Sequence, residues 1–169
     1  MRLPICAFDA KTGILCPKCE GKIKSGHLTR DDVDTAIKMT KIQDKILNLE
    51  KTTLLHAVNV GGDLVLVMGK GAHEILRENQ DASKSLEKIF DRKIWIVEGE
   101  TSDRQFLEDM FYPIKILMVN VIWLPDGSKL TKVIIPGRRT ERFPLNIEQI
   151  IAVVKAVRGI ELIVEFERR

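Results

Sequence analysis

The chain has 169 residues, of which 44% are hydrophobic and 30% charged, and its formal net charge is only +3. This composition is typical of an ordinary globular protein with one or two small domains, and it excludes a histone-like polycation. No run reaches the roughly 18 apolar residues that a membrane-spanning helix needs, and no apolar signal-peptide core follows Met1–Pro4. We therefore expect a cytoplasmic protein without a membrane partner.

All three cysteines lie in the first 20 residues, and their spacing is that of a metal site. An odd count without a secretion signal argues against a disulfide framework. Cys16 and Cys19 are separated by two residues, as in a zinc knuckle, where two thiolates chelate one tetrahedral ion. Cys6 and Asp9 repeat that spacing, and His27 is the other candidate for the fourth ligand. The alternatives are one structural zinc ion and a small core of reduced cysteines.

The next part of the chain predicts a mixed helix and strand unit. The predicted elements are a helix over residues 31–50, strands over 54–60 and 63–68, two short helices over 72–92 and a strand over 93–98. Thr29 and Asp32 have the spacing of a capping box at the start of the first helix. Gly61 and Gly62 supply the positive φ angles of a tight hairpin turn.

The same order then returns. The predicted elements are a helix from Ser102 that ends before Pro113, strands over 114–124 and 129–135, an irregular basic stretch after Pro136, a helix from Asn146 to about Arg158 and a strand over 160–166. Pro125 and Gly127 are typical of a turn. Asn146 can cap the last helix, and Gly159 fits its C-terminal stop.

This repeat predicts an α+β protein in three parts, a cysteine-bearing knuckle (1–30) and two units of order α-β-β-α-α-β (31–100 and 101–169). Only residues 99–101 separate the two copies. So short a link predicts that the units pack together rather than swing freely.

The order α-β-β-α-α-β resembles that of the KH domain, and the pair resembles the archaeal NusA-like tandem KH proteins. The likeness covers about residues 31–167 and is strongest over 64–67, 86–98 and 106–113. It implies an RNA-binding factor associated with RNA polymerase. In that family a Gly-x-x-Gly turn lets the backbone approach four nucleotides. The corresponding positions, 77–81 and 140–144, contain no glycine.

With that turn replaced, we expect positive side chains to hold RNA through its phosphates. The predicted RNA-binding residues are Arg138, Arg139, Arg142, Lys18, Lys22, Lys24 and Arg30. The sequence thus predicts an RNA-binding accessory factor of transcription elongation or termination, with modest sequence preference. The alternatives are a protein-interaction scaffold that docks on RNA polymerase or a ribosomal particle, and a metal-dependent redox or sensor protein.

Two further patterns argue against an enzyme. Gly69-Lys70-Gly71 lies between a strand and a helix but lacks the spacing of a phosphate-binding loop, so we interpret it as a corner. His56 and His73 are isolated histidines, and no serine elbow or pair of carboxylates stands beside them. We therefore do not expect catalysis.

Overall fold

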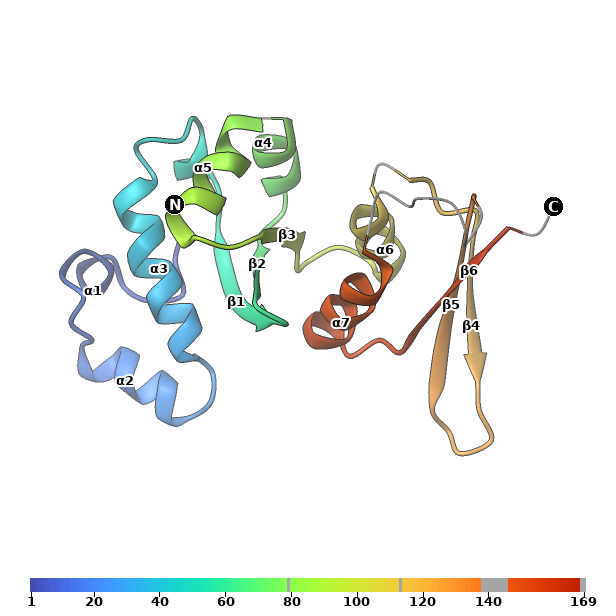
Figure 1. Cartoon of the computed structure of the whole chain (residues 1–169). Helices are drawn as coiled ribbons and strands as arrows, with labels where there is room; N and C mark the ends of the chain where they lie inside the picture. The colour runs from blue at the N-terminus through green and yellow to red at the C-terminus, as the bar shows by residue number, and fades with distance from the viewer. Residues whose placement is uncertain (79, 113, 138–145, 168–169) are drawn as a thin grey trace. The chain divides into compact units, whose positions relative to one another are not determined.

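The computed structural model describes residues 1–78, 80–112, 114–137 and 146–167. The chain divides into two units, Met1–Glu100 and Thr101–Arg169, which we call the first and second unit (Figure 1). Each unit contains one three-stranded sheet together with helices. The predicted α+β class is therefore confirmed. None of the helices in the described ranges is long and apolar enough to cross a membrane.

The first unit carries most of the helices. Its elements are α1 (Ala7–Thr12), α2 (Pro17–Lys24), α3 (Arg30–Ile42), the 3-10 turn η1 (Leu49–Lys51), β1 (Leu54–Val60), β2 (Asp63–Met68), α4 (Ala72–Glu78), α5 (Gln80–Phe90) and β3 (Ile94–Glu98). β1 pairs antiparallel with β2, and β2 pairs parallel with β3. Gly61 and Gly62 have φ angles of 55° and 89°, as the predicted hairpin turn requires.

The core of the first unit lies between its sheet and its helices. Leu64, Leu66 and Met68 alternate along β2, so they share one face, and all three are fully buried. Ala36 and Met39 of α3 belong to the same buried cluster. Burial of each large apolar side chain contributes roughly 1.5–3 kcal/mol, and the sheet is therefore the platform on which the helices are held.

The cysteine-bearing segment is part of the first unit. The amide of Arg2 donates to the Thr52 carbonyl oxygen at 3.1 Å, and the Leu54 amide donates to the Arg2 carbonyl oxygen at 2.8 Å. Ile5 and Cys19 are buried in the same cluster as the sheet residues. Residues 1–30 therefore share a hydrophobic core with the rest of this unit.

The first long helix is shorter than the prediction of residues 31–50. α3 ends at Ile42, and η1 follows only after a turn in which Asn48 has a φ angle of 63°. Ile46 and Leu49 are nevertheless buried. The spacing of these apolar residues predicted a longer helix. A turn whose apolar side chains also face the core can show the same spacing in the sequence.

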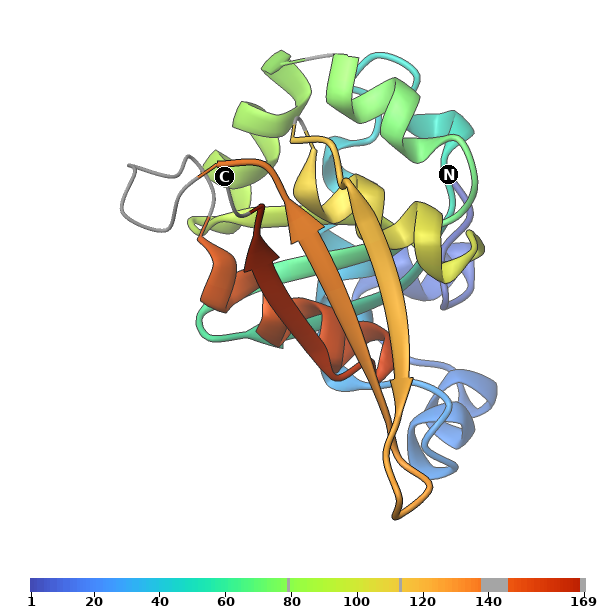
Figure 2. The same cartoon turned by 90° about the vertical axis from the view of Figure 1, so that its right-hand side faces the viewer.

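The second unit places two helices against its sheet. Its elements are α6 (Asp103–Phe111), β4 (Met118–Trp123), β5 (Lys129–Ile135), α7 (Ile147–Arg158) and β6 (Leu162–Phe166). Figure 2 shows the three strands side by side with both helices behind them. The buried side chains on the helix side include Phe106, Leu107, Phe111, Ile150, Val153, Val154, Val133 and Ile135. Arg158 also ties the two helices together, since its guanidinium lies 2.8 Å from the Asp103 carboxylate.

β4 begins later than the predicted start at residue 114. The Ile114 amide still donates to the Phe111 carbonyl oxygen at 2.8 Å, which extends the end of α6. The pairing strand β5 ends at Ile135, and Pro136, which has no N–H to donate, follows it. Residues 114–116 therefore lie outside the ladder although Ile114 and Ile116 are apolar.

The strand order and directions are the same in both units. β4 pairs antiparallel with β5, and β5 pairs parallel with β6, just as β1, β2 and β3 do. The predicted pair of short helices over 72–92 is confirmed as α4 and α5. The corresponding stretch of the second unit, including positions 140–144, lies outside the described residues.

Candidate metal centre

Two short helices each begin with a pair of candidate ligands. Cys6 is the N-cap of α1 and Asp9 is its third residue, while Cys16 is the N-cap of α2 and Cys19 its third residue. N-cap and third-residue side chains lie on the same side of the first helical turn, which is why capping boxes form at this spacing. Pro17 at the first position of α2 favours a helix start there. Local helix geometry therefore pairs the ligands within each motif.

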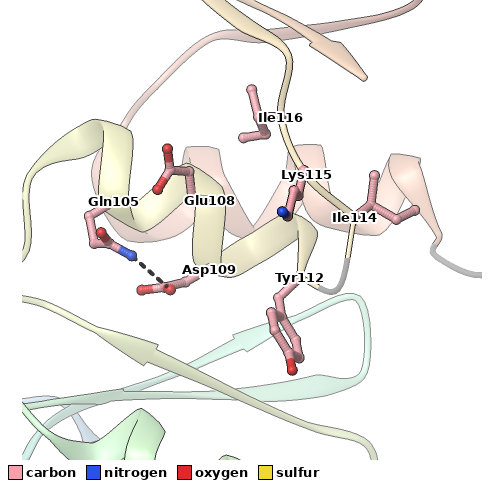
Figure 3. Close-up of a pocket in the computed structure, with 7 residues that line it drawn as sticks. All are labelled: Gln105, Glu108, Asp109, Tyr112, Ile114, Lys115 and Ile116. Atoms are coloured by element: carbon pink, nitrogen blue, oxygen red, sulfur yellow. Dashed lines mark hydrogen bonds between the residues drawn. The ribbon is translucent and has the colours of Figure 1, made fainter. Parts of the chain in front are cut away.

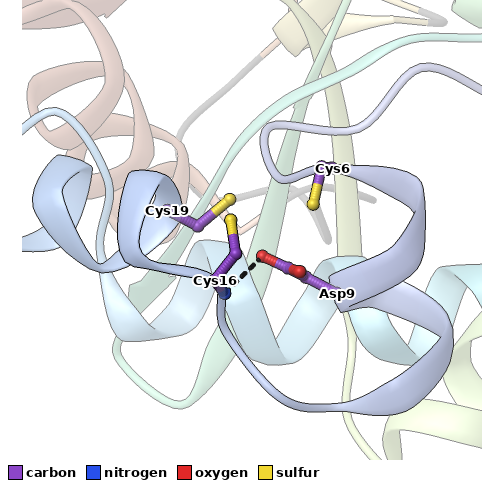
Figure 4. A group of neighbouring side chains, drawn as sticks. All are labelled: Cys6, Asp9, Cys16 and Cys19. Carbon is purple, nitrogen blue, oxygen red and sulfur yellow. Dashed lines mark hydrogen bonds between the residues drawn. The ribbon is translucent and has the colours of Figure 1, made fainter.

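The loop between the helices brings the two pairs together. Gly13 ends α1 in the left-handed region, with φ 76°, and reverses the chain toward α2. The amide of Cys16 donates to Asp9 Oδ2 at 2.9 Å. As Figure 4 shows, the three sulfur atoms and the carboxylate converge, and one ligand atom from each residue lies within 4.8 Å of the others. We call Cys6, Asp9, Cys16 and Cys19 the CDCC cluster.

The donor set of the CDCC cluster fits a tetrahedral metal ion. Ligand atoms about 2.3 Å from a central ion lie roughly 3.8 Å apart in a tetrahedron, so the widest pair would close by about 1 Å. Asp9 is 0% exposed, and its Oδ1 atom has no hydrogen-bond partner among the described residues. Buried carboxylate oxygens are normally hydrogen-bonded or bound to a cation. The four residues can therefore hold a metal ion.

The protonation of the cluster follows from its contacts. The pKa of Asp9 lies below its usual range. The main cause is the backbone amide of Cys16, and the thiols of Cys6 and Cys19 contribute less. Burial raises the pKa of the Cys19 thiol to about 12, and the neighbouring Asp9 carboxylate raises the pKa of the Cys6 thiol. Since a metal ion binds the thiolate form, its binding here would release protons.

His27, the other predicted fourth ligand, does not lie in the cluster. Its Nδ1 atom is 2.8 Å from the hydroxyl of Ser25, and its side chain is exposed just after α2. The structure thus brings all three predicted thiols together with the predicted carboxylate. The sequence left both candidates open, although the spacing of Asp9 from Cys6 matches the first turn of a helix and is the signal that could have separated Asp9 from His27.

The predicted RNA-binding residues fall into two groups. Lys18, Lys22 and Lys24 of α2 and Arg30 at the start of α3 are exposed. Within the described parts of the chain, none of these four forms an ion pair with an acidic side chain. Arg138, Arg139 and Arg142 lie outside the described residues. Of the predicted RNA-binding residues, those within the described part of the chain therefore lie on α2 and at the start of α3.

The glycine-rich corner before α4 is already occupied by a carboxylate. Glu98 of β3 is buried, and its Oε1 atom accepts hydrogen bonds from the amides of Gly71 and His73, each at 3.1 Å. These amides are the free donors with which a helix start would otherwise bind an anion. The interpretation of residues 69–71 as a corner fits this arrangement, and sequence reasoning missed Glu98 because it lies 25 residues away.

Replacement of Glu98 by Ala is expected to destabilise the first unit by about 1–3 kcal/mol, because it leaves two amide donors at the start of α4 without this acceptor. The measurement is urea unfolding followed by tryptophan fluorescence. Glu100→Ala is the control, since Glu100 is exposed just beyond β3. Equal stability of the two variants would show that the amides do not depend on Glu98.

A pocket of about 400 Å³ lies beside α6 in the second unit. Its lining residues are Gln105, Glu108, Asp109, Tyr112, Ile114, Lys115 and Ile116 (Figure 3). Gln105 Nε2 donates to Asp109 Oδ1 at 3.1 Å across one side of it. Among these lining residues there is no serine, cysteine or histidine. We assign no chemistry to this pocket.

Comparison with known proteins gives a fold relationship only. No protein-family model matches the chain, and no curated protein matches it. Among solved structures, the crystal structure of APE1850 is similar, with a TM-score of 0.52 and 16% sequence identity over 77% of this chain and 95% of that chain. At this identity the likeness concerns the fold and not the activity.

Proposed function

We propose that the protein is an RNA-binding accessory factor of the archaeal NusA-like tandem KH type, acting in transcription elongation or termination. The observation that carries the proposal is the repeated topology, in which each unit has an antiparallel pair followed by a parallel pair. From α3 onward, the order of helices and strands in the first unit resembles that of a KH domain. Two copies of one nucleic-acid-binding module in a single chain support a role in holding an extended RNA strand.

The route of binding differs from that of the standard KH grip. Residues 77–81, to which the resemblance assigns the Gly-x-x-Gly loop, contain no glycine. A β-carbon where that family has glycine would obstruct the close approach of a nucleotide backbone, and the exposed Asp81 repels phosphate. We therefore assign the main contribution to Lys18, Lys22, Lys24 and Arg30, together with Arg138, Arg139 and Arg142.

We further propose that the CDCC cluster binds one structural zinc ion. Four protein ligands fill a tetrahedral coordination sphere, so no position stays open for a substrate or a reactive water. A zinc ion bound there would cross-link α1 to α2 and would have no catalytic role. The cluster would thereby hold the cationic helix α2 in a fixed position against the core. Elemental analysis of the purified protein tests this proposal, and absence of a stoichiometric metal would contradict it.

Single-stranded RNA is expected to bind with an affinity that falls steeply with salt, because phosphate contacts release counterions. Replacing both Lys18 and Lys22 by Ala is expected to weaken binding and to reduce the slope of log K against log salt by about 1.4, or about 0.7 per lost contact. Fluorescence anisotropy at several salt concentrations measures both quantities. The triple change of Arg138, Arg139 and Arg142 to Ala tests the second group in the same way.

The matched control for the α2 pair is Lys84→Ala with Lys88→Ala on α5. These lysines are also exposed and four residues apart on a helix of the first unit. Binding that is absent at low salt would contradict the proposed function. An equal loss in both double variants would show that only the total charge matters and that α2 is not the contact surface.

A second candidate function is a protein-interaction scaffold on RNA polymerase or a ribosomal particle. It is favoured by the outer face of the second sheet, opposite α6 and α7 (Figure 2), where Met118, Ile122 and Ile163 are exposed. Such apolar side chains on one face are typical of contact surfaces. Co-purification of RNA polymerase subunits that survives nuclease and is lost on Ile122→Lys would favour this function over RNA binding.

A further inference from the structure

Two large apolar side chains beside the CDCC cluster point into solvent. Phe8 is 71% exposed and Ile14 is 72% exposed. Phe8 directly precedes Asp9, and Ile14 lies two residues before Cys16. A single exposed apolar residue is ordinary. Here, however, two exposed apolar residues lie close in the sequence to members of the CDCC cluster.

A single hydroxyl group fixes the backbones of these two residues relative to each other. Thr12 Oγ1 donates to the Phe8 carbonyl oxygen at 2.9 Å and accepts from the Ile14 amide at 3.3 Å. Gly13 makes the intervening turn with φ 76°. Lys11 lies three residues after Phe8 in α1, and residues at this spacing occupy the same face of a helix. The backbone between Phe8 and Ile14 is therefore constrained, and a lysine shares the helix face of Phe8.

The charge carried by residues 1–30 is mostly positive. The basic residues among the first 30 are Arg2, Lys11, Lys18, Lys22, Lys24 and Arg30, and all six are exposed. The acidic residues of the same segment are Asp9 and Glu20, and Asp9 is buried in the cluster. A partner for this surface must carry negative charge and also offer a flat apolar face.

We propose that Phe8 and Ile14 form a stacking platform for one unpaired base of single-stranded RNA. The inference rests on the proposed RNA binding and names its contact site. The base stacks on the Phe8 ring, Ile14 packs against its edge, and Lys11 and Lys18 neutralise the adjoining phosphates. Single-stranded RNA offers anionic groups and exposed base faces in one chain, and stacking on aromatic side chains is tolerant of sequence.

The test separates stacking from charge. Phe8→Ala is expected to weaken binding of a fluorescein-labelled single-stranded RNA by roughly 5-fold or more while leaving the salt slope unchanged. Lys11→Ala is expected to weaken binding and to reduce the slope by about 0.7. An RNA carrying 2-aminopurine should change its fluorescence on binding the natural chain, and Phe8→Ala should abolish that change. Phe8→Trp keeps an aromatic face and should retain both the affinity and the signal.

Leu47→Ala is the matched control, because Leu47 is 75% exposed in the same unit but lies beyond α3. Its RNA affinity is expected to equal that of the natural chain. Equal affinity of Phe8→Ala and the natural chain would overturn the platform and leave the proposed function standing. Failure of the natural chain to bind RNA would overturn both. A changed sedimentation coefficient with unchanged RNA affinity in Phe8→Ala would assign Phe8 to self-association and also overturn the platform.

Discussion

Cys19→Ser is expected to remove the metal from the purified protein and to lower the stability of the first unit by about 2 kcal/mol or more, which corresponds to roughly 8–16 °C in melting temperature. The expected effect is large because Cys19 is only 2% exposed and belongs to the cluster of core residues that also contains Leu28. Loss of the proposed metal would therefore loosen α2 from the core. Elemental analysis gives the metal content. Thermal unfolding in a Trp123→Phe background follows Trp95 and so reports the first unit alone.

Changes at the fourth ligand sharpen this prediction. Asp9→Asn is expected to weaken metal affinity by about 10–100-fold or more. Loss of a residue that only contacts a metal ligand already weakens affinity by about this factor, and Asp9 is itself a proposed ligand. Asp9→Cys completes a four-thiolate site and is expected to keep a stoichiometric metal. His27→Ala is the control and should keep both metal and melting temperature. Retention of metal by Asp9→Asn, together with its loss in His27→Ala, would place the fourth ligand at His27 and contradict the cluster.

Asp32→Ala is expected to destabilise the first unit by about 3–5 kcal/mol, because the buried Asp32 carboxylate joins α3 to the sheet. Its Oδ2 atom accepts from the Thr29 amide at 2.9 Å, and its Oδ1 atom accepts from the Ala57 amide at 2.7 Å. Hydrogen bonds to a charged group contribute roughly 1.5–3 kcal/mol each. The variant would also leave the amide of Ala57, which is buried, without a partner. Urea unfolding followed by circular dichroism measures the loss.

Two variants separate the cap of Asp32 from its tertiary contact. Asp32→Asn keeps one acceptor oxygen and is expected to lose about half as much stability as Asp32→Ala. Ser102→Ala removes only the exposed cap of α6, in which the Ser102 hydroxyl accepts from the Gln105 amide at 3.2 Å. That change is expected to cost about 1 kcal/mol. If Asp32→Ala cost no more than Ser102→Ala, the bond to Ala57 would contribute nothing.

The two proposals for residues 1–30 depend on each other physically. The CDCC cluster is built from the first turns of α1 and α2, and the same two helices carry Phe8, Lys11 and Lys18. A metal that holds the helix starts together also holds this surface in one arrangement. RNA affinity of the Cys19→Ser variant is therefore expected to fall further than that of Lys18→Ala, since it loses the arrangement and not one charge.

Features determined by neighbouring residues could be predicted from the sequence. The capping box of Thr29 and Asp32, the hairpin at Gly61 and Gly62 and the cap of α7 at Asn146 are all found where the pattern indicated them. Each depends on residues within three positions of one another, so its geometry is encoded locally. The bounds of α3 and β4 were wrong because helix and strand ends depend on what the chain packs against or pairs with.

By itself, the sequence determined the order of the described helices and strands from α3 onward and the turns between them. It also contained the repeated spacing of the ligand pairs, but it did not predict that α1 and α2 begin at those pairs. Only the tertiary structure decided that Asp9 and not His27 joins the thiols, that Glu98 fills the start of α4 and that Asp32 reaches Ala57. The physical reason is that local backbone geometry sets which neighbours share a turn. Contacts between groups 7 to 27 residues apart exist only once a common core has fixed the distance between them.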